Sequence, residues 1–166
     1  MSEENKRSIR ISVRNLVEFV LRSGDIDNRR SGNAQKDAML AGGRIHRKIQ
    51  KRMGSGYRAE VPLKHEVTDD EQEIVLSVEG RADGIFTENG ITVIDEIKGM
   101  YTDVARLEAP IEVHLAQAMC YGYFYCCDKD LDGIRLQLTY CNLETEEIRR
   151  FQEIQTMDEL SEWFAG

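Results

Sequence analysis

The sequence predicts an α/β fold of the α+β kind, with a mixed β-sheet flanked by helices. Apolar residues recur at helical spacing in some segments, and in others they form short runs or alternate with polar residues. The expected elements follow the order ααβββαββα, so strands are both grouped and interrupted by a helix. At 166 residues, the chain has the length of one domain with its own buried core.

The first two helices are predicted from their apolar spacing and their ends. Ser12 is the expected N-cap of the first helix, which should stop near Ser23-Gly24. Its apolar face consists of Val13, Leu16, Val17, Val20 and Leu21. A basic loop is expected over 25–33, followed by a second helix from about Ala34 to Met53. Gly54-Ser55-Gly56 should end that helix.

The middle of the chain is predicted to be rich in β-structure. One strand is expected over 57–68, followed by a turn over 69–72. The next strand or pair of strands covers 73–88, and 91–98 forms the returning strand. Between them, Asn89-Gly90 is typical of a two-residue type I′ hairpin turn.

The last third is predicted to contain two helices and two strands. The expected elements are a loop over 99–109, a helix from near Pro110 to about Cys126, and strands near 134–142 and 147–155. Thr156 and Glu159 have the spacing of a capping box for a final helix that ends near Phe164.

The charge of the chain is distributed unevenly. The formal net charge is −8, although residues 1–60 hold 14 Lys and Arg against 7 Asp and Glu. Residues 61–166 hold 8 basic and 23 acidic residues, a balance of −15. The densest basic stretch is 44–52, which suits either a solvated helix face or a surface for a polyanion.

A cytoplasmic location and no association with a membrane are expected. No apolar run approaches the 20 or so residues of a membrane span, and the N-terminal residues lack the apolar core of a signal peptide. The cysteines are Cys120, Cys126, Cys127 and Cys141, whose spacing matches no zinc or iron–sulfur pattern. We interpret them as small apolar residues in a reducing compartment.

The hairpin places three polar residues on one face. If Asn89-Gly90 is a two-residue turn, Asp83 lies directly opposite Glu96, and Lys98 shares the face of Glu96. Asp95 should then point away. Two opposed carboxylates repel unless a cation or a proton lies between them, so the trio suits a Mg²⁺ or Mn²⁺ site with a catalytic lysine. The alternative is a solvent-facing Glu–Lys ladder, against which the apolar Val93 and Ile94 argue.

These residues resemble the motifs of the PD-(D/E)XK nuclease superfamily. The match consists of Gly80-Arg81-Ala82-Asp83 followed by Ile94-Asp95-Glu96-Ile97-Lys98, with Ala82 where proline is usual. Gly42-Gly43-Arg44-Ile45-His46 resembles the helix-borne histidine motif of the RecB-type branch. Gln117-Ala118-Met119-Cys120-Tyr121 is similar to its QxxxY motif. Each motif is short, and the four in this order are much more specific than any one alone.

The resemblance implies a restriction-endonuclease-like core over 34–156, with 1–33 as an N-terminal helix and basic loop and 157–166 as a C-terminal helix. It implies that Asp83, Glu96 and Lys98 are catalytic. The implied metal ligands are His46, Asp83, Glu96 and the Ile97 carbonyl. The implied substrate-binding residues are Gln117, Tyr121, Arg44 and Arg81. Read in isolation, His46 also suits a surface histidine, and Gln117 with Tyr121 suits the polar edge of a packed helix.

The resemblance also bears on cofactors and partners. CRISPR-associated RecB-like exonucleases and helicase-fused nuclease domains belong to this branch. Some members carry an iron–sulfur cluster held by one cysteine before the nuclease core and three after it. Here no cysteine precedes Cys120, so we expect no cluster. The expected cofactor is Mg²⁺ or Mn²⁺, and the expected partners are single-stranded DNA or DNA ends, with a helicase domain or subunit as a further candidate. The sequence leaves the oligomeric state open.

The expected function is metal-dependent hydrolysis of phosphodiester bonds in DNA, most simply as an exonuclease. Two alternatives stay open at this point. The chain is either a non-cleaving DNA-binding or helicase-accessory module with a nuclease-like fold, or an unrelated α+β protein in which the motifs are coincidental. The three hypotheses differ in whether Asp83 and Glu96 share a face and whether they hold a metal.

Overall fold

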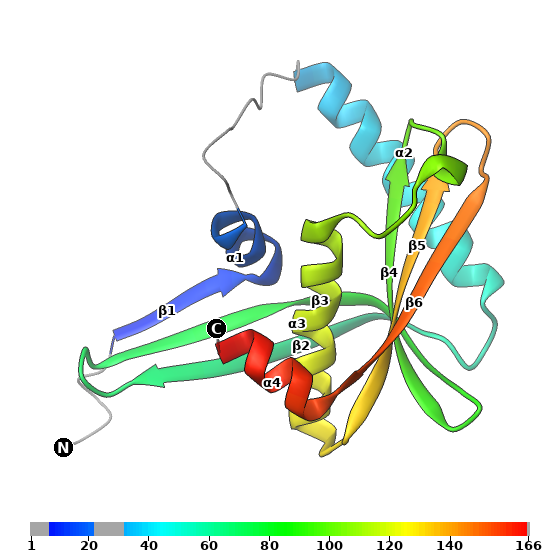
Figure 1. Ribbon diagram of the computed structural model, residues 1–166. Coiled ribbons are helices and arrows are strands. Elements are labelled where there is room, and N and C mark those ends of the chain that lie inside the picture. The colour runs from blue at the N-terminus through cyan, green and yellow to red at the C-terminus, as the bar shows by residue number, and fades with distance from the viewer. Residues whose placement is uncertain (1–6, 22–31, 166) are drawn as a thin grey trace.

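The computed structural model describes residues 7–21 and 32–165, which form a six-stranded mixed sheet and four α-helices (Figure 1). The strands are β1 (Arg7–Ser12), β2 (Arg58–Asp69), β3 (Ile74–Glu88), β4 (Ile91–Met100), β5 (Gly133–Asn142) and β6 (Ile148–Thr156). The helices are α1 (Val13–Val20), α2 (Gly32–Arg52), α3 (Glu112–Lys129) and α4 (Met157–Ala165), with a short 3-10 helix, η2 (Val104–Arg106), after β4. The sheet is open, and the predicted α+β class with a mixed sheet is confirmed.

The long strand β3 determines how the sheet is arranged. β2 pairs antiparallel with β3 from Ile74 to Ile85 and so occupies one of its two edges. The other edge is shared, because β1 pairs parallel with β3 as far as Glu79 and β4 pairs antiparallel from Gly84 onward. Beyond β4, the strands β5 and β6 extend the sheet, in parallel and antiparallel pairing respectively.

The shared edge of β3 leaves a short stretch between its two partner strands. We call this place the fork, meaning residues 80–83 of β3 together with residues 96–98 of β4, which diverge there. Neither the β1 ladder nor the β4 ladder includes residues 80–83. On this edge, the main-chain groups at the fork must therefore find hydrogen-bond partners other than those of a sheet ladder.

The turn between β3 and β4 agrees with the sequence pattern. Asn89 and Gly90 both have positive φ, 53° and 79°, which is the combination that a type I′ turn requires. The ladder pairs Glu88 with Ile91 and Gly84 with Asp95, so the predicted register is confirmed along its length. Asp83 and Glu96 are the next residues beyond the last ladder pair, at the point where the two strands begin to diverge.

The predicted element order is wrong at its beginning, because it lacks β1. Residues 7–12 contain only two apolar side chains, Ile9 and Ile11, and Ile9 is 45% exposed. The strand is held by its parallel ladder with residues 74–79 of β3. A local pattern reveals no such strand, because its partner lies far along the chain.

The helix caps follow the predicted signals. The Ser12 hydroxyl oxygen accepts the Asn15 N–H at 3.0 Å at the start of α1. Before α4, Thr156 Oγ1 accepts the Glu159 N–H, and Glu159 Oε1 accepts the Thr156 N–H, both at 3.1 Å. This reciprocal pair is the predicted capping box.

The helix ends differ from prediction by a few residues. α1 ends at Val20, before the expected Ser23-Gly24, which lies outside the described residues together with residues 25–31 of the expected basic loop. α2 begins two residues before Ala34, at Gly32. α3 continues past Cys126 to Lys129, where Asp130 has the left-handed conformation of a helix cap.

Helices cover both faces of the sheet (Figure 1). α1, α3 and α4 pack on one face around the larger core, in which the largest buried side chains include Phe124, Tyr140 and Leu160. On the other face, Ile45 and Ile49 of α2 pack against Ile97 in a smaller cluster. None of the described helices combines the length and apolar character needed to cross a membrane.

Gly84 gives a test of the packing beside the fork. A Cβ built on Gly84 would lie 1.8 Å from Tyr57 Cζ, so any larger residue overpacks this site. We predict that Gly84→Ala lowers the free energy of unfolding in denaturant by about 1–3 kcal/mol, the usual cost of an overpacked core. The control is Gly56→Ala, whose added Cβ meets no atom within 4 Å. Equal stability of the two variants would contradict this account.

Candidate active site at the fork of the sheet

Asp83 lies at the centre of the fork and replaces the missing ladder with bonds of its own. Its Oδ2 accepts the main-chain N–H of Ile97 at 2.7 Å, and its main-chain N–H lies 3.5 Å from Glu96 Oε1. Both carboxylates are nearly inaccessible, with exposed fractions of 9% for Asp83 and 3% for Glu96. The two acidic groups named from the hairpin register are thus buried neighbours at the fork, and we call the place where they lie the recess.

His46 approaches the same recess from α2. Its Nδ1 lies 3.4 Å from Asp83 Oδ1. The helix is held at this position because Ile45 and Ile49 are buried against Ile97 of β4. Residues that differ by one position on a helix point about 100° apart, so burial of Ile45 leaves His46 at the edge of the contact, facing the fork.

Lys98 of β4 contacts α3, which packs on the face of the sheet opposite to α2. Its Nζ donates to Gln117 Oε1 at 2.6 Å and lies 3.6 Å from Glu96 Oε2. The lysine side chain is 15% exposed and the glutamate side chain 4%, so the pair is screened less than a surface pair. This ammonium group is therefore held at the wall of the recess in a defined position.

Tyr121 packs one turn beyond Gln117 on α3, over the β3 side of the fork. A Cβ added to Gly80 would lie 2.5 Å from the Tyr121 hydroxyl oxygen, so the absence of a side chain at Gly80 makes room for the phenol. Burial raises the pKa of Tyr121, and the negative charges of Glu96 and Asp83 raise it further. The phenol therefore stays protonated and available as a hydrogen-bond donor.

The two remaining predicted substrate-binding residues do not contact this cluster. Arg44 on α2 and Arg81 on β3 are both exposed, and within the described residues neither makes an ion pair or hydrogen bond. Arg81 lines a shallow groove with Pro62 and Lys64. The structure thus brings six of the predicted side chains together and leaves the two arginines exposed at the surface.

Ile97 contributes main chain to the site and side chain to the core. Its N–H fixes Asp83, and its side chain is fully buried against α2. No contact of its carbonyl oxygen bears on the predicted role as a metal ligand, which stays a prediction.

Gln50 is a site residue that the motifs missed. Its Nε2 donates to the main-chain oxygen of Asp83 at 2.9 Å and lies 3.1 Å from Glu60 Oε1. Gln50 is four residues after His46, so both side chains lie on the same face of α2. The spacing gives only this shared face, because the sequence does not show that the partner of Gln50 is the Asp83 carbonyl.

His114 and Arg14 also belong to the surroundings of the site. His114 Nδ1 is 3.0 Å from the Tyr140 hydroxyl. Burial lowers the pKa of His114 to about 4, and the positive charges of Lys98 and Arg14 lower it further, so the imidazole is neutral at pH 7. Arg14 lies at the start of α1, and its charge also lowers the pKa of Tyr121.

Asp95 faces away from the recess, as the register predicts. It is fully buried and accepts hydrogen bonds from Tyr57 at 2.7 Å, Thr139 at 2.7 Å and Gln137 at 3.2 Å. Burial raises the pKa of Asp95, and these three donors oppose the shift. Asp95 is thereby a structural anchor between β4, β5 and the start of β2, which leaves Glu96 as the acidic group of β4 at the recess.

The Glu96 carboxyl is held in an environment that disfavours its charge. Burial raises the pKa of Glu96 well above its usual range and the charge of Asp83 raises it further, whereas Lys98 and the Asp83 N–H lower it. A cation placed beside both carboxylates would offset this repulsion.

The donor set suits a hard divalent cation. Carboxylate oxygens and an imidazole nitrogen are ligands that Mg²⁺ or Mn²⁺ accepts. In the described parts of the chain, however, no three His, Cys, Asp or Glu side chains form a group already arranged to hold a metal ion. The reason is visible in the contacts, since Asp83 Oδ2 is directed at the Ile97 N–H and Glu96 Oε1 at the Asp83 N–H.

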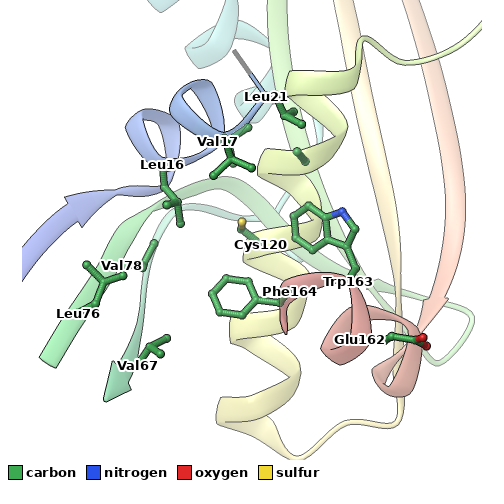
Figure 2. Close-up of a pocket in the computed structure, with 12 residues that line it drawn as sticks. Leu16, Val17, Leu21, Val67, Leu76, Val78, Cys120, Glu162, Trp163 and Phe164 are labelled. Carbon is green, nitrogen blue, oxygen red and sulfur yellow. The ribbon is translucent and has the colours of Figure 1, made fainter. Parts of the chain in front are cut away.

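An apolar cavity lies elsewhere in the molecule. It has a volume of about 590 Å³ and is lined by residues of α1, α3, α4, β2 and the N-terminal half of β3 (Figure 2). Its walls are almost wholly apolar and include Leu16, Val78, Cys120 and Trp163. Such walls lack the groups that a phosphodiester needs, so the polar cluster at the fork is the better candidate for chemistry.

The cysteines pack as the sequence suggested. Cys120, Cys126 and Cys141 are buried with free thiols, and Cys127 is exposed. Burial raises the pKa of Cys120 to about 12 and that of Cys126 to about 11, so both thiols stay protonated. The buried three therefore behave as small apolar residues.

Comparison with known proteins supports the fold. No known family profile matches the chain, and no curated protein does. Among solved structures, the crystal structure of SSO0001 is similar, with a TM-score of 0.60 and 21% identity. The match covers 98% of this chain and 76% of that one. At this identity, the likeness shows a shared fold alone.

The electrostatics of Glu96 predict a pH-dependent stability change. A carboxyl whose pKa is raised on folding stabilises the protein below its unfolded pKa of about 4.3, and this contribution is lost as pH rises through the folded pKa. We predict that the change in the free energy of unfolding caused by Glu96→Gln is more stabilising at pH 7 than at pH 4, by roughly 1–3 kcal/mol. Denaturant unfolding at both pH values measures this difference.

The control for this experiment is Glu66→Gln. Glu66 pairs with Lys64 on the exposed surface of β2, at 3.3 Å. Such a pair contributes little to stability, so its removal should have a small effect at both pH values. An effect of Glu96→Gln that is equal at pH 4 and pH 7 would show that Glu96 is not under electrostatic strain.

Proposed function

We propose that this chain is a metal-dependent deoxyribonuclease of the RecB-type branch of the PD-(D/E)XK superfamily. The observation that carries the proposal is the convergence at the fork. Asp83, Glu96 and Lys98 come from two diverging strands, while His46 and Gln117 reach them from helices on opposite faces of the sheet. Residues so far apart in sequence meet in one recess and carry the groups that phosphodiester hydrolysis needs.

In this proposal, Mg²⁺ or Mn²⁺ is held by His46 and the carboxylates of Asp83 and Glu96. A bound divalent cation supplies Lewis acidity and a water of lowered pKa. The nearly complete burial of Asp83 and Glu96 strengthens their electrostatic interaction with a cation, because the recess is poorly screened. The Ile97 N–H holds Asp83 in place, so the carboxylate costs little to orient.

Lys98 acts on the phosphate and the attacking water. Its ammonium group donates to Gln117 and pairs with Glu96, so it is oriented by two partners before substrate arrives. A fixed positive charge in a recess stabilises negative charge as it develops on the phosphate oxygens. Gln117 positions the lysine, and the protonated phenol of Tyr121 offers a hydrogen bond to the substrate.

The substrate class follows from the recess and its rim. Arg44 on α2 and Arg81 on β3 are exposed and suit contacts to phosphates. A phosphodiester must enter a recess between two helices, and a flexible single strand or a DNA end does this more readily than continuous duplex, which is stiff over about 50 nm. We therefore propose exonuclease action on single strands or ends, in the cytoplasm, with a helicase domain or subunit as a candidate partner.

One observation favours the alternative of a non-cleaving DNA-binding or helicase-accessory module. Asp83 and Glu96 each direct an oxygen at a main-chain N–H instead of at a common point. If this arrangement persists in the presence of metal, the domain binds DNA without cutting it.

Lys98→Ala tests the catalytic proposal. We predict that this variant loses at least 100-fold in the Mn²⁺-dependent cleavage rate of a labelled single-stranded oligonucleotide, because it removes a positioned charge from the recess. Asp83→Ala should lose cleavage to a similar extent. Lys129→Ala, at the far end of α3, is the control and should cut like the wild type. Cleavage that persists in both site variants would eliminate the assignment.

Mn²⁺ titration by calorimetry separates the nuclease from the non-cleaving module. We predict binding at sub-millimolar to millimolar Mn²⁺ by the wild type and at least tenfold weaker binding by Asp83→Asn, which keeps the shape of the side chain but removes its charge. His46→Gln should weaken binding less, because imidazole is one neutral ligand of the set. Absence of binding by the wild type would favour the non-cleaving module.

A further inference from the structure

A basic groove runs along the outer side of α2. It has a volume of about 600 Å³ and is lined by Arg47, Lys48, Gln50, Lys51 and Ala59, the last at the beginning of β2. Three of the five side chains are basic, which is unusual in a chain whose net charge is −8. Arg47 and Lys51 are four residues apart, so they lie on one face of the helix.

The basic side chains of the groove differ in how they are engaged. Lys48 pairs with Glu146 and is therefore partly neutralised. Arg47 and Lys51 are exposed, and no described residue makes an ion pair or hydrogen bond with either. Two cations that have no partner among the described residues, on a mostly acidic chain, form a local site of attraction for a polyanion.

The groove is connected to the fork through Gln50. The Gln50 amide lines the groove and donates to the Asp83 carbonyl oxygen at 2.9 Å. His46, one turn before Gln50, lies 3.4 Å from the Asp83 carboxylate. Arg47 and Lys51 are therefore next to His46 and Gln50 on the surface of α2. A DNA strand that leaves the recess on this side would meet the groove next.

We propose that this groove binds the phosphate backbone of single-stranded DNA that continues from the fork, with Arg47 and Lys51 as the phosphate contacts. The inference rests on the proposed function for the identity of the substrate. What the inference adds is the path of the DNA strand, which runs along α2 and not across the face of the sheet covered by α1 and α4. Contacts to phosphates do not distinguish one base from another, so this binding should be independent of the DNA sequence.

Salt-dependent binding tests the groove. Fluorescence anisotropy is measured with a labelled oligothymidylate without divalent metal, so that cleavage does not interfere. For Arg47→Ala/Lys51→Ala we expect binding on the order of tenfold weaker at 0.1 M salt. We also expect the slope of log K against log salt to be shallower by about 1.4, because each lost single-strand phosphate contact removes about 0.7.

The matched control is Arg7→Ala/Lys129→Ala, which removes the same charge from the far ends of β1 and α3. It should bind like the wild type, and thermal unfolding should be unchanged in both double variants, since all four side chains are on the surface. The inference is overturned if the groove variant binds like the wild type, if both double variants weaken binding equally, or if the wild type binds duplex more tightly than the single strand.

The outcomes for the groove and for catalysis are distinguishable. If Lys98→Ala cuts normally while the groove variant still loses binding, the proposed nuclease fails and the groove stands. If Lys98→Ala is inactive while the groove variant binds DNA normally, the nuclease stands and the groove is eliminated.

Discussion

The hydrogen bond from the Ile97 N–H to Asp83 Oδ2 is the interaction on which the rest of the site depends. β3 carries two partners on one edge, so β4 has to leave it where β1 approaches. A parting of strands exposes main-chain donors, and an unpaired buried N–H is costly. The carboxylate of Asp83 satisfies such a donor and keeps the strands at a fixed separation. The same bond thus closes the sheet and positions the acid.

A cost of this arrangement is the burial of like charges. Glu96 lies beside Asp83 with almost no access to water, and Lys98 is the one cation that the described structure pairs with it. Burial raises the pKa of Glu96 and the charge of Asp83 raises it further, and the single ammonium group of Lys98 opposes this shift without cancelling it. A fold selected for stability alone would gain by replacing such a pair with apolar residues. The presence of these charges is the physical argument for the proposed catalytic role.

Much of the fork could be predicted from the sequence because it is set locally. Asn89-Gly90 determines the register of a hairpin, and the register alone decides that Glu96 and not Asp95 shares a face with Asp83. β1 could not be predicted, since its stability comes from a ladder with a distant strand. Gln50 was missed because glutamine in a polar helix carries no signal until its partner, the Asp83 carbonyl, is known. The resemblance pointed to His46, but its distance from Asp83 depends on how α2 packs on β4.

The two faces of β4 carry a structural polar network and the proposed active site respectively. On one face, Asp95 is bound by Tyr57, Thr139 and Gln137, and this network joins β4 to β5 and to the segment that follows α2. The network holds the β4 backbone in place, and Glu96, the next residue along, points to the opposite face. The polar cluster around Asp95 therefore supports the position of the charged cluster around Glu96. α2 is fixed twice, by Ile45 and Ile49 against Ile97 and by Gln50 to Asp83. Because the helix that carries His46 is attached to both strands of the fork, movement of either strand would displace the histidine and the carboxylates together.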